Sequence, residues 1–124
     1  MNYTGLLHGS VVVGDTDRAL AFYCDALGLP VDDSRPDLGY PGAWLNVGDQ
    51  QIHLLELPNP DPVTQRPSHG GRDRHLALGV TDLDTLCHRL EQHGVAVSRS
   101  KSGRRAAFCR DPDGNAIELI ESSD

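Results

Sequence analysis

The sequence predicts an α+β fold of two tandem βαβββ units, with a curved mixed sheet that encloses a metal site. Two observations lead to this prediction: the chain matches itself at a nearly constant offset, and each copy alternates strand-like and helix-like hydrophobic patterns. Its 124 residues suit one domain, or two small repeats that share a core. We expect a single domain over residues 1–124, with unit one at about 1–58, a linker at 59–73 and unit two at about 74–124.

The internal match has two parts. The first part aligns HGSVVVGDTDRALAFYCDALGL, which begins at His8, with HLALGVTDLDTLCHRLEQHGV, which begins 67 residues later at His75. The second part aligns the strand-like segments QIHLLELP and AIELIE, so that Glu118 follows His53 by 65 residues. Two nearly equal offsets at separate places in the chain indicate a tandem duplication.

Unit one opens with a strand and a helix. The segment His8–Val13 is apolar and β-branched, which favours a strand. The helix begins at Asp15 or Thr16, either of which can cap it, and ends at Gly28. Its predicted apolar stripe consists of Leu20, Tyr23, Cys24 and Leu27. The strands expected after it are Ala43–Val47 and Gln51–Leu57, with a weak one near Pro30–Asp33.

Unit two repeats this order with a clearer helix. After the strand His75–Val80, Thr81 and Asp84 make a start that resembles a capping box, and Gly94 ends the helix. The predicted stripe consists of Leu83, Leu86, Cys87 and Leu90. The strands expected after it are Ala96–Arg99, Ala106–Arg110 and Ala116–Ile120. Between the units, Pro58–Arg74 is rich in proline and glycine and is expected to be a mobile linker.

Composition narrows the classes of function. Eighteen acidic against eleven basic residues give a net charge of −7, which argues against non-specific binding of nucleic acid or of anionic membranes. No signal peptide is evident, and no stretch approaches the ~20 apolar residues of a membrane span. Cys24, Cys87 and Cys109 form no CxxC pair and are expected in the core. A cytoplasmic location is the resulting expectation.

Four side chains that can bind metal fall at repeat-related positions. His8 and His75 open the first strand of each unit, while His53 and Glu118 lie on the last strand. If the units pack about a pseudo-twofold axis, all four can point at one centre, so we predict them as the metal ligands. Each of these side chains could also have an ordinary structural role, and His53 could instead contact the substrate.

Strand alternation supports this choice of residues. Because side chains two apart share a face, His53 and Glu118 occupy corresponding faces of their strands, whereas Glu56 and Glu121 lie on the opposite faces. Glu56 is therefore a poor candidate ligand. The remaining histidines, His69, His88 and His93, are expected to lie in the linker or off the apolar stripe.

Imidazole and carboxylate ligands suit a divalent metal ion such as Zn, Ni, Co, Mn or Fe. A metal would also offset the cost of placing the charge of Glu118 in an apolar strand. Four protein ligands leave two open positions on an octahedral ion, where vicinal oxygens of a small-molecule substrate can bind. The basic group Lys101, Arg104 and Arg105 is expected in a solvated hairpin, with binding of an anionic substrate group as the alternative.

These features resemble the vicinal oxygen chelate superfamily, which includes glyoxalase I, bleomycin-resistance proteins and extradiol dioxygenases. The resemblance covers nearly the whole chain and is strongest in AFCRDPDGNAIELIE and GDTDRALAFYCDALGL. It implies metal ligands at His8, His75 and Glu118, and it places His53 where bacterial glyoxalase I has glutamate. It also implies a homodimer whose sites are often built from halves of two subunits.

The resemblance implies a glyoxalase-I-like lyase or isomerase that uses Zn or Ni, with Fe, Mn and Co as other choices. Glu118 would be both a ligand and the catalytic base. The alternative is an Fe(II) extradiol-type dioxygenase in which His8, His75 and Glu118 form a facial triad. A second alternative is a non-catalytic drug-binding resistance protein.

Overall fold

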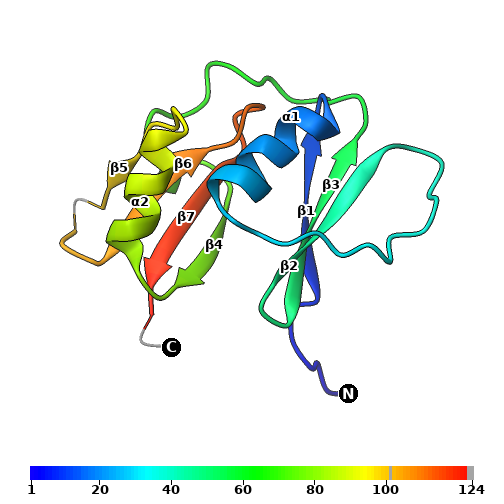
Figure 1. Cartoon of the computed structure of the whole chain (residues 1–124), viewed down its shortest axis with the longest axis horizontal. Helices are drawn as coiled ribbons and strands as arrows, with labels where there is room; N and C mark the ends of the chain where they lie inside the picture. The colour runs from blue at the N-terminus through cyan, green and yellow to red at the C-terminus, as the bar shows by residue number, and fades with distance from the viewer. Residues whose placement is uncertain (101, 123–124) are drawn as a thin grey trace.

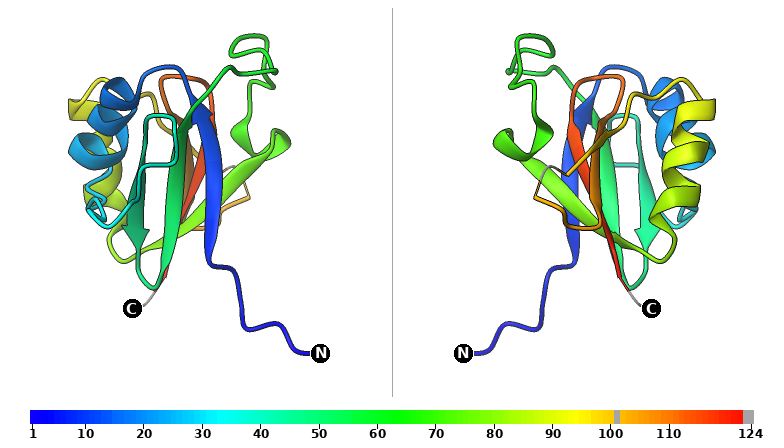
Figure 2. Two further views of the ribbon diagram at one scale, coloured as in Figure 1. Left: turned by 90° about the vertical axis from the view of Figure 1, so that its right-hand side faces the viewer. Right: turned by 90° about the vertical axis from the view of Figure 1, so that its left-hand side faces the viewer.

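The computed structural model describes residues 1–100 and 102–122. Its elements confirm the predicted α+β class, with two mixed sheets and with the main helices gathered on one side of them (Figures 1 and 2). Unit one contains β1 (His8–Val13), α1 (Thr16–Leu20), the π-helix η1 (Ala21–Ala26), β2 (Gly42–Val47) and β3 (Gln50–Glu56). Unit two contains β4 (His75–Val80), α2 (Leu83–Gln92), β5 (Ser98–Arg99), β6 (Ala106–Arg110) and β7 (Ala116–Glu121), preceded by the 3₁₀-helix η2 (Gly70–Arg72).

The two sheets have matching topologies. The first has the order β1-β3-β2 and the second β4-β7-β6-β5, with β1 parallel to β3, β4 parallel to β7 and the other pairs antiparallel. The registers also correspond, since His8 pairs with Gln51 and His75 with Ala116. The weak strand expected near Pro30–Asp33 is reduced to a single bridge between Val31 and Leu45.

The units run in opposite senses in the molecule. In Figure 1, β1 and β3 point upward while β4 and β7 point downward, which is the arrangement that a pseudo-twofold axis between the units would produce. One continuous group of buried side chains joins both units, and it includes Tyr23, Leu54, Leu90 and Leu119.

The first helix differs from its prediction in the face that it buries. Asp15 caps it by accepting a hydrogen bond from the Arg18 amide, and Gly28 ends the helical segment with a φ of +82°. The second part of the helix, η1, is a wider π-type turn, which rotates later side chains relative to a 3.6-residue stripe. As a result Leu20 and Cys24 are only half-buried, and the buried positions are Ala19, Phe22, Tyr23, Ala26 and Leu27.

The second helix follows its predicted stripe, with Leu83, Cys87 and Leu90 buried and Leu86 half-buried. Its cap was predicted one residue too early. Asp82 accepts the hydrogen bond from the Thr85 amide at 3.1 Å, so the capping box predicted from Thr81 does not form. Gly94 ends the helix with a φ of +78°, as predicted. All three cysteines are free, with Cys87 and Cys109 buried.

The segment between the units is more structured than a mobile linker. Asp73 lies at its end with only 8% of its side chain exposed, and both Arg66 and Arg110 form ion pairs with it, at 2.7 and 2.8 Å. The Arg66 and Arg110 hydrogen bonds hold the pKa of Asp73 far below its usual range. Proline and glycine content could not reveal these pairs, because Arg110 comes from β6. Among the described residues, no helix is long and apolar enough to cross a membrane.

Candidate metal centre

The first pair of predicted ligands lies on one face of the first sheet. Since β1 and β3 are adjacent and Ser10 pairs with His53, the side chains of His8 and His53 fall side by side. Their rings stack with centroids 3.8 Å apart and planes 13° apart. Trp44 of β2 stacks on His53 as well, at 4.5 Å. The histidine pair therefore rests on an aromatic support.

A hydrogen-bond network fixes the orientation of His53. Its Nε2 lies 2.8 Å from Oε1 of Gln51, and the amide nitrogen of Gln51 donates to Asp32 and Asn46. Because that amide donates elsewhere, its oxygen faces His53, which makes Nε2 the protonated ring nitrogen and leaves a lone pair on Nδ1. Burial, followed by the nearby His8, lowers the pKa of His53. His53 is therefore a neutral imidazole at pH 7, the form that binds metal.

The second pair lies on the second sheet. His75 opens β4 and Glu118 lies in the middle of the adjacent β7, with Nε2 of His75 3.2 Å from Oε1 of Glu118. The other ring nitrogen of His75, Nδ1, lies 2.8 Å from the backbone carbonyl of Asp73. A carbonyl can only accept, so Nδ1 carries a proton and donates to Asp73, which leaves Nε2 facing a carboxylate oxygen of Glu118. An imidazole nitrogen and a carboxylate oxygen that face each other are two side-chain groups of the kinds that bind divalent metal ions.

This arrangement fits a divalent metal ion. A histidine ligand commonly donates its second ring N–H to a carbonyl or carboxylate, which fixes the tautomer and the ring orientation. The Asp73 carbonyl does this for His75. A further cation already compensates Glu118, whose residue is only 6% exposed: the guanidinium of Arg104 lies 2.5 Å from its Oε2.

The neighbouring glutamates have a structural role, as the strand alternation predicts. Glu56 accepts a hydrogen bond from the Thr16 amide at 2.8 Å, and Glu121 accepts one from the Leu83 amide at 3.1 Å. Each glutamate thus binds the first turn of the helix in its own unit, on the face of the strand opposite His53 or Glu118. The two units therefore share this hydrogen bond between the last strand and the helix.

The four predicted ligands form two pairs rather than one cluster within a single chain. In residues 1–100 and 102–122 there is no group of three or more histidine, cysteine, aspartate or glutamate side chains placed to hold a metal ion. Whether the four side chains would meet within one chain or across a dimer is not decided by the sequence, and within one chain they lie as two separate pairs. Each pair belongs to its own sheet, and no strand pairing within residues 1–100 and 102–122 joins the two sheets.

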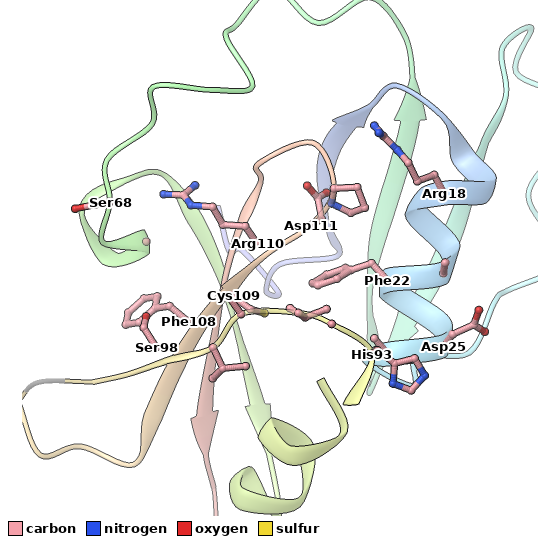
Figure 3. Close-up of a pocket in the computed structure, with 18 residues that line it drawn as sticks. Arg18, Phe22, Asp25, Ser68, His93, Ser98, Phe108, Cys109, Arg110 and Asp111 are labelled. Atoms are coloured by element: carbon pink, nitrogen blue, oxygen red, sulfur yellow. The ribbon is translucent and has the colours of Figure 1, made fainter. Parts of the chain in front are cut away.

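Two hollows lie near these residues. A cavity of about 300 Å³ between the two sheets is lined by His75, together with Val12 of β1 and Ala116 of β7. A larger cleft of about 680 Å³ lies between α1, the segment after α2 and β6 (Figure 3). None of the four predicted ligands lines the larger cleft. Phe108 borders it, and the Phe108 ring also contacts His75 edge-on with centroids 5.8 Å apart.

Other site features were not predicted. Trp44, Gln51 and the Asp73 carbonyl were missed, although Trp44 could have been found as the strand partner of His53. The basic group divides: Arg104 binds Glu118, Arg105 binds Glu121 and Asp84, and Lys101 lies outside the described residues. His69 accepts from the Gly71 amide, and His93 bonds the Arg89 carbonyl, so the structural roles expected for these histidines hold.

Comparisons with known proteins match the chain to one superfamily over nearly its whole length. The sequence profile of the Glyoxalase/Bleomycin resistance protein/Dioxygenase superfamily matches residues 5–119. The chain is 35% identical to a lactoylglutathione lyase of Salmonella typhimurium, over 96% of this chain and 93% of that one. It is 34% identical to the lactoylglutathione lyase of Haemophilus influenzae, over 94% and 92%. Its fold resembles TnmS3, an antibiotic binding protein from Streptomyces sp. CB03234, with a TM-score of 0.76 and 28% identity over 99% of both chains.

Proposed function

Because this chain belongs to the Glyoxalase/Bleomycin resistance protein/Dioxygenase superfamily, we propose that it is a metal-dependent lyase of the glyoxalase I type. The observation that carries this proposal is the pairing of His75 with the buried Glu118, with Nε2 of His75 turned toward the carboxylate and Nδ1 held by the Asp73 carbonyl. The curated relatives named lactoylglutathione lyase support the reaction type. The substrate would be a small hemithioacetal.

We place the complete site between two copies of the chain. Each chain supplies two half-sites, His8 with His53 and His75 with Glu118. In a twofold dimer the contact is reciprocal, so one half-site of each subunit can meet the other half-site of its partner and give two four-ligand centres. The N-terminal segment fits such an assembly, because the apolar side chains of Tyr3, Leu6 and Leu7 are largely exposed.

The metal, for which Zn or Ni suits the imidazole-rich ligand set, would supply Lewis acidity toward two neighbouring substrate oxygens. The protein residues hold the geometry and move the proton. The Asp73 carbonyl orients His75, and Gln51 with Trp44 orients His53. Glu118 is the residue that takes the proton from one substrate carbon and returns it to the adjacent one. Its burial keeps competing water away from that carboxylate.

His53 favours one competing function. Where a second carboxylate would serve proton transfer, this chain has an imidazole that stacks between His8 and Trp44. A His-His-Glu set is typical of iron sites that use dioxygen, so an Fe(II) extradiol-type dioxygenase is the second candidate. A non-catalytic drug-binding protein is the third, and the fold similarity to TnmS3 is the observation behind it.

The test is to measure metal content by mass spectrometry on protein without a histidine tag, followed by a hemithioacetal isomerisation assay. We expect about one Zn or Ni per chain in the parent and less in His53→Ala. The matched control is His93→Ala, since His93 lies outside both pairs and only bonds its own helix. Iron together with dioxygen-dependent cleavage of a catechol would favour the second candidate. No metal after reconstitution would contradict both enzymatic proposals.

A further inference from the structure

We propose that Arg104 supplies the positive charge that compensates Glu118 when no metal is bound, so that metal binding must displace Arg104 from that carboxylate. This inference rests on the proposed metal site. It concerns a residue that the ligand set does not include. The geometry that suggests it is the Arg104 guanidinium at 2.5 Å from Oε2 of Glu118, beside the His75 contact at 3.2 Å on Oε1.

Glu118 needs a cation in the metal-free chain. Only 7% of its side chain is exposed, and an unpaired carboxylate at that depth would be strongly destabilising. Among the described residues, Arg104 is the only lysine or arginine with an ion pair to Glu118. His75, the other contact, lies at 3.2 Å from the second carboxylate oxygen through its Nε2. Arg104 therefore supplies the charge that a metal would otherwise supply.

The position of Arg104 allows its side chain to move away from Glu118 into water. Its side chain is 57% exposed, and it lies in the turn between β5 and β6, next to Gly103 with a φ of +79°. Moving an exposed guanidinium into water costs little, because water replaces its hydrogen bonds. Neighbouring Arg105 points to the other face of the hairpin and binds Glu121 and Asp84. One hairpin thus presents one cation to the site and one to the structural glutamate.

The metal ion and the guanidinium would compete for one carboxylate. A divalent ion binds a carboxylate oxygen at ~2.0–2.2 Å, which would put it within a few ångströms of the guanidinium on the other oxygen. Because the carboxylate between them is buried, water screens their repulsion less than it would on an open surface. The alternative is that Arg104 stays hydrogen-bonded to Glu118 and orients the carboxylate when metal binds. In that case the loss of the Arg104 side chain would weaken metal binding.

The experiment is a Zn²⁺ titration of metal-stripped full-length protein, in competition with a chromophoric chelator, for the parent and three variants. We expect Arg104→Ala to bind Zn²⁺ about five- to tenfold more tightly than the parent. Arg104→Lys should remain near the parent because it keeps the charge. Arg105→Ala is the matched control, and its Zn²⁺ affinity should be unchanged.

Unchanged or weaker Zn²⁺ binding by Arg104→Ala, with the parent still binding, would overturn the inference and leave the proposed function intact. No Zn²⁺ binding by any of the four proteins would instead contradict the proposed function. A second measurement does not depend on the variants folding. In the parent, the side-chain Nη–H resonances of Arg104 should shift and lose their protection from exchange as Zn²⁺ is added, and unperturbed resonances at saturation would contradict displacement.

Discussion

At the scale of single residues, two glutamates on opposite faces of β7 make different contacts. Glu118 faces His75 and Arg104, whereas Glu121 binds the first turn of α2. The two carboxylates are three residues apart on the same strand and differ in what they touch. A matched pair of substitutions can therefore test the assignment of function to Glu118 without changing the strand or the type of residue.

Glu118→Gln is expected to lower hemithioacetal turnover by at least about a hundredfold, because it removes the proposed base and a charged ligand. Glu121→Gln is expected to keep that activity and to lose up to about 1 kcal/mol of unfolding free energy, because it removes the ion pair with Arg105 and weakens the Leu83 hydrogen bond. Steady-state rates and urea denaturation of both variants measure these effects. Equal activities in the two variants would remove Glu118 from the mechanism.

Asp73 connects the site to the segment before it. Its carboxylate binds Arg66 and Arg110, and its backbone carbonyl holds His75. We expect Asp73→Asn to cost about 3 kcal/mol of unfolding free energy, because it leaves two arginines without their carboxylate. Asp61→Asn is the control: its pair with Arg74 is exposed, so a change within about 0.5 kcal/mol is expected.

The same residue predicts an acid dependence. The arginine hydrogen bonds lower the folded-state pKa of Asp73 below its unfolded value of about 3.9. Its stabilisation is therefore fully present above that unfolded value and is lost as the pH falls toward the folded one. Urea midpoints measured from pH 6 downward should fall more steeply in the parent than in Asp73→Asn. Parallel curves would contradict this account of the linker.

At the scale of elements, hydrophobic periodicity predicted most of the fold. The strands β1, β4 and β6 match their predicted bounds, and the stripe of α2 is buried as expected. The stripe of the first helix was only partly right, because the π-type turn of η1 has no signature in a 3.6-residue pattern. For the site, alternation within a strand assigned the faces of His53, Glu56 and Glu118, since that information is local.

Contacts between distant segments could not be predicted in the same way. The pairs Arg104 with Glu118 and Arg110 with Asp73 depend on how hairpins and loops fold over a sheet. Whether the two ligand pairs meet depends on how the units pack, and the internal repeat alone does not fix that. The repeat predicted the four residues as ligands and left their convergence open.

One buried contact joins the helix of unit one to the last hairpin of unit two. Tyr23 is fully buried and donates from its hydroxyl to Asp111 at 2.8 Å, and Asn115 donates to the same carboxylate and to the Val12 carbonyl. Burial, followed by the charge of Asp111, raises the pKa of Tyr23 well above its usual value. The neutral hydroxyl is therefore part of the connection between the units.

Because the pKa of Tyr23 is raised in the folded state, the contribution of this contact to stability is lost at alkaline pH. The contribution of Tyr23 is fully present below the unfolded pKa of about 10 and is lost as the pH rises above it. Tyr23→Phe should cost about 1–2 kcal/mol of unfolding free energy at pH 7 and should flatten the fall in stability above pH 10. Thermal unfolding across that range is the measurement. Tyr3→Phe, at an exposed tyrosine, should match the parent, and an equal alkaline fall in Tyr23→Phe would contradict the assignment.

At the scale of the whole molecule, a single chain is half of the proposed assembly. Each sheet presents one ligand pair, and the described part of one chain gathers no group of three. The proposed dimer combines the pair on the first sheet of one subunit with the pair on the second sheet of its partner. In this account the duplication supplies both halves of a site, and dimerisation joins them.

The most direct test mixes two inactive chains. One carries His8→Ala with His53→Ala, the other carries His75→Ala with Glu118→Gln, and the two are given different tags so that the mixed dimer can be isolated. Neither variant alone should bind metal tightly, because every site lacks one pair. The mixed dimer should bind about one zinc ion and recover turnover, since one of its two sites has all four ligands. A mixed dimer without tightly bound zinc would contradict a site shared between subunits.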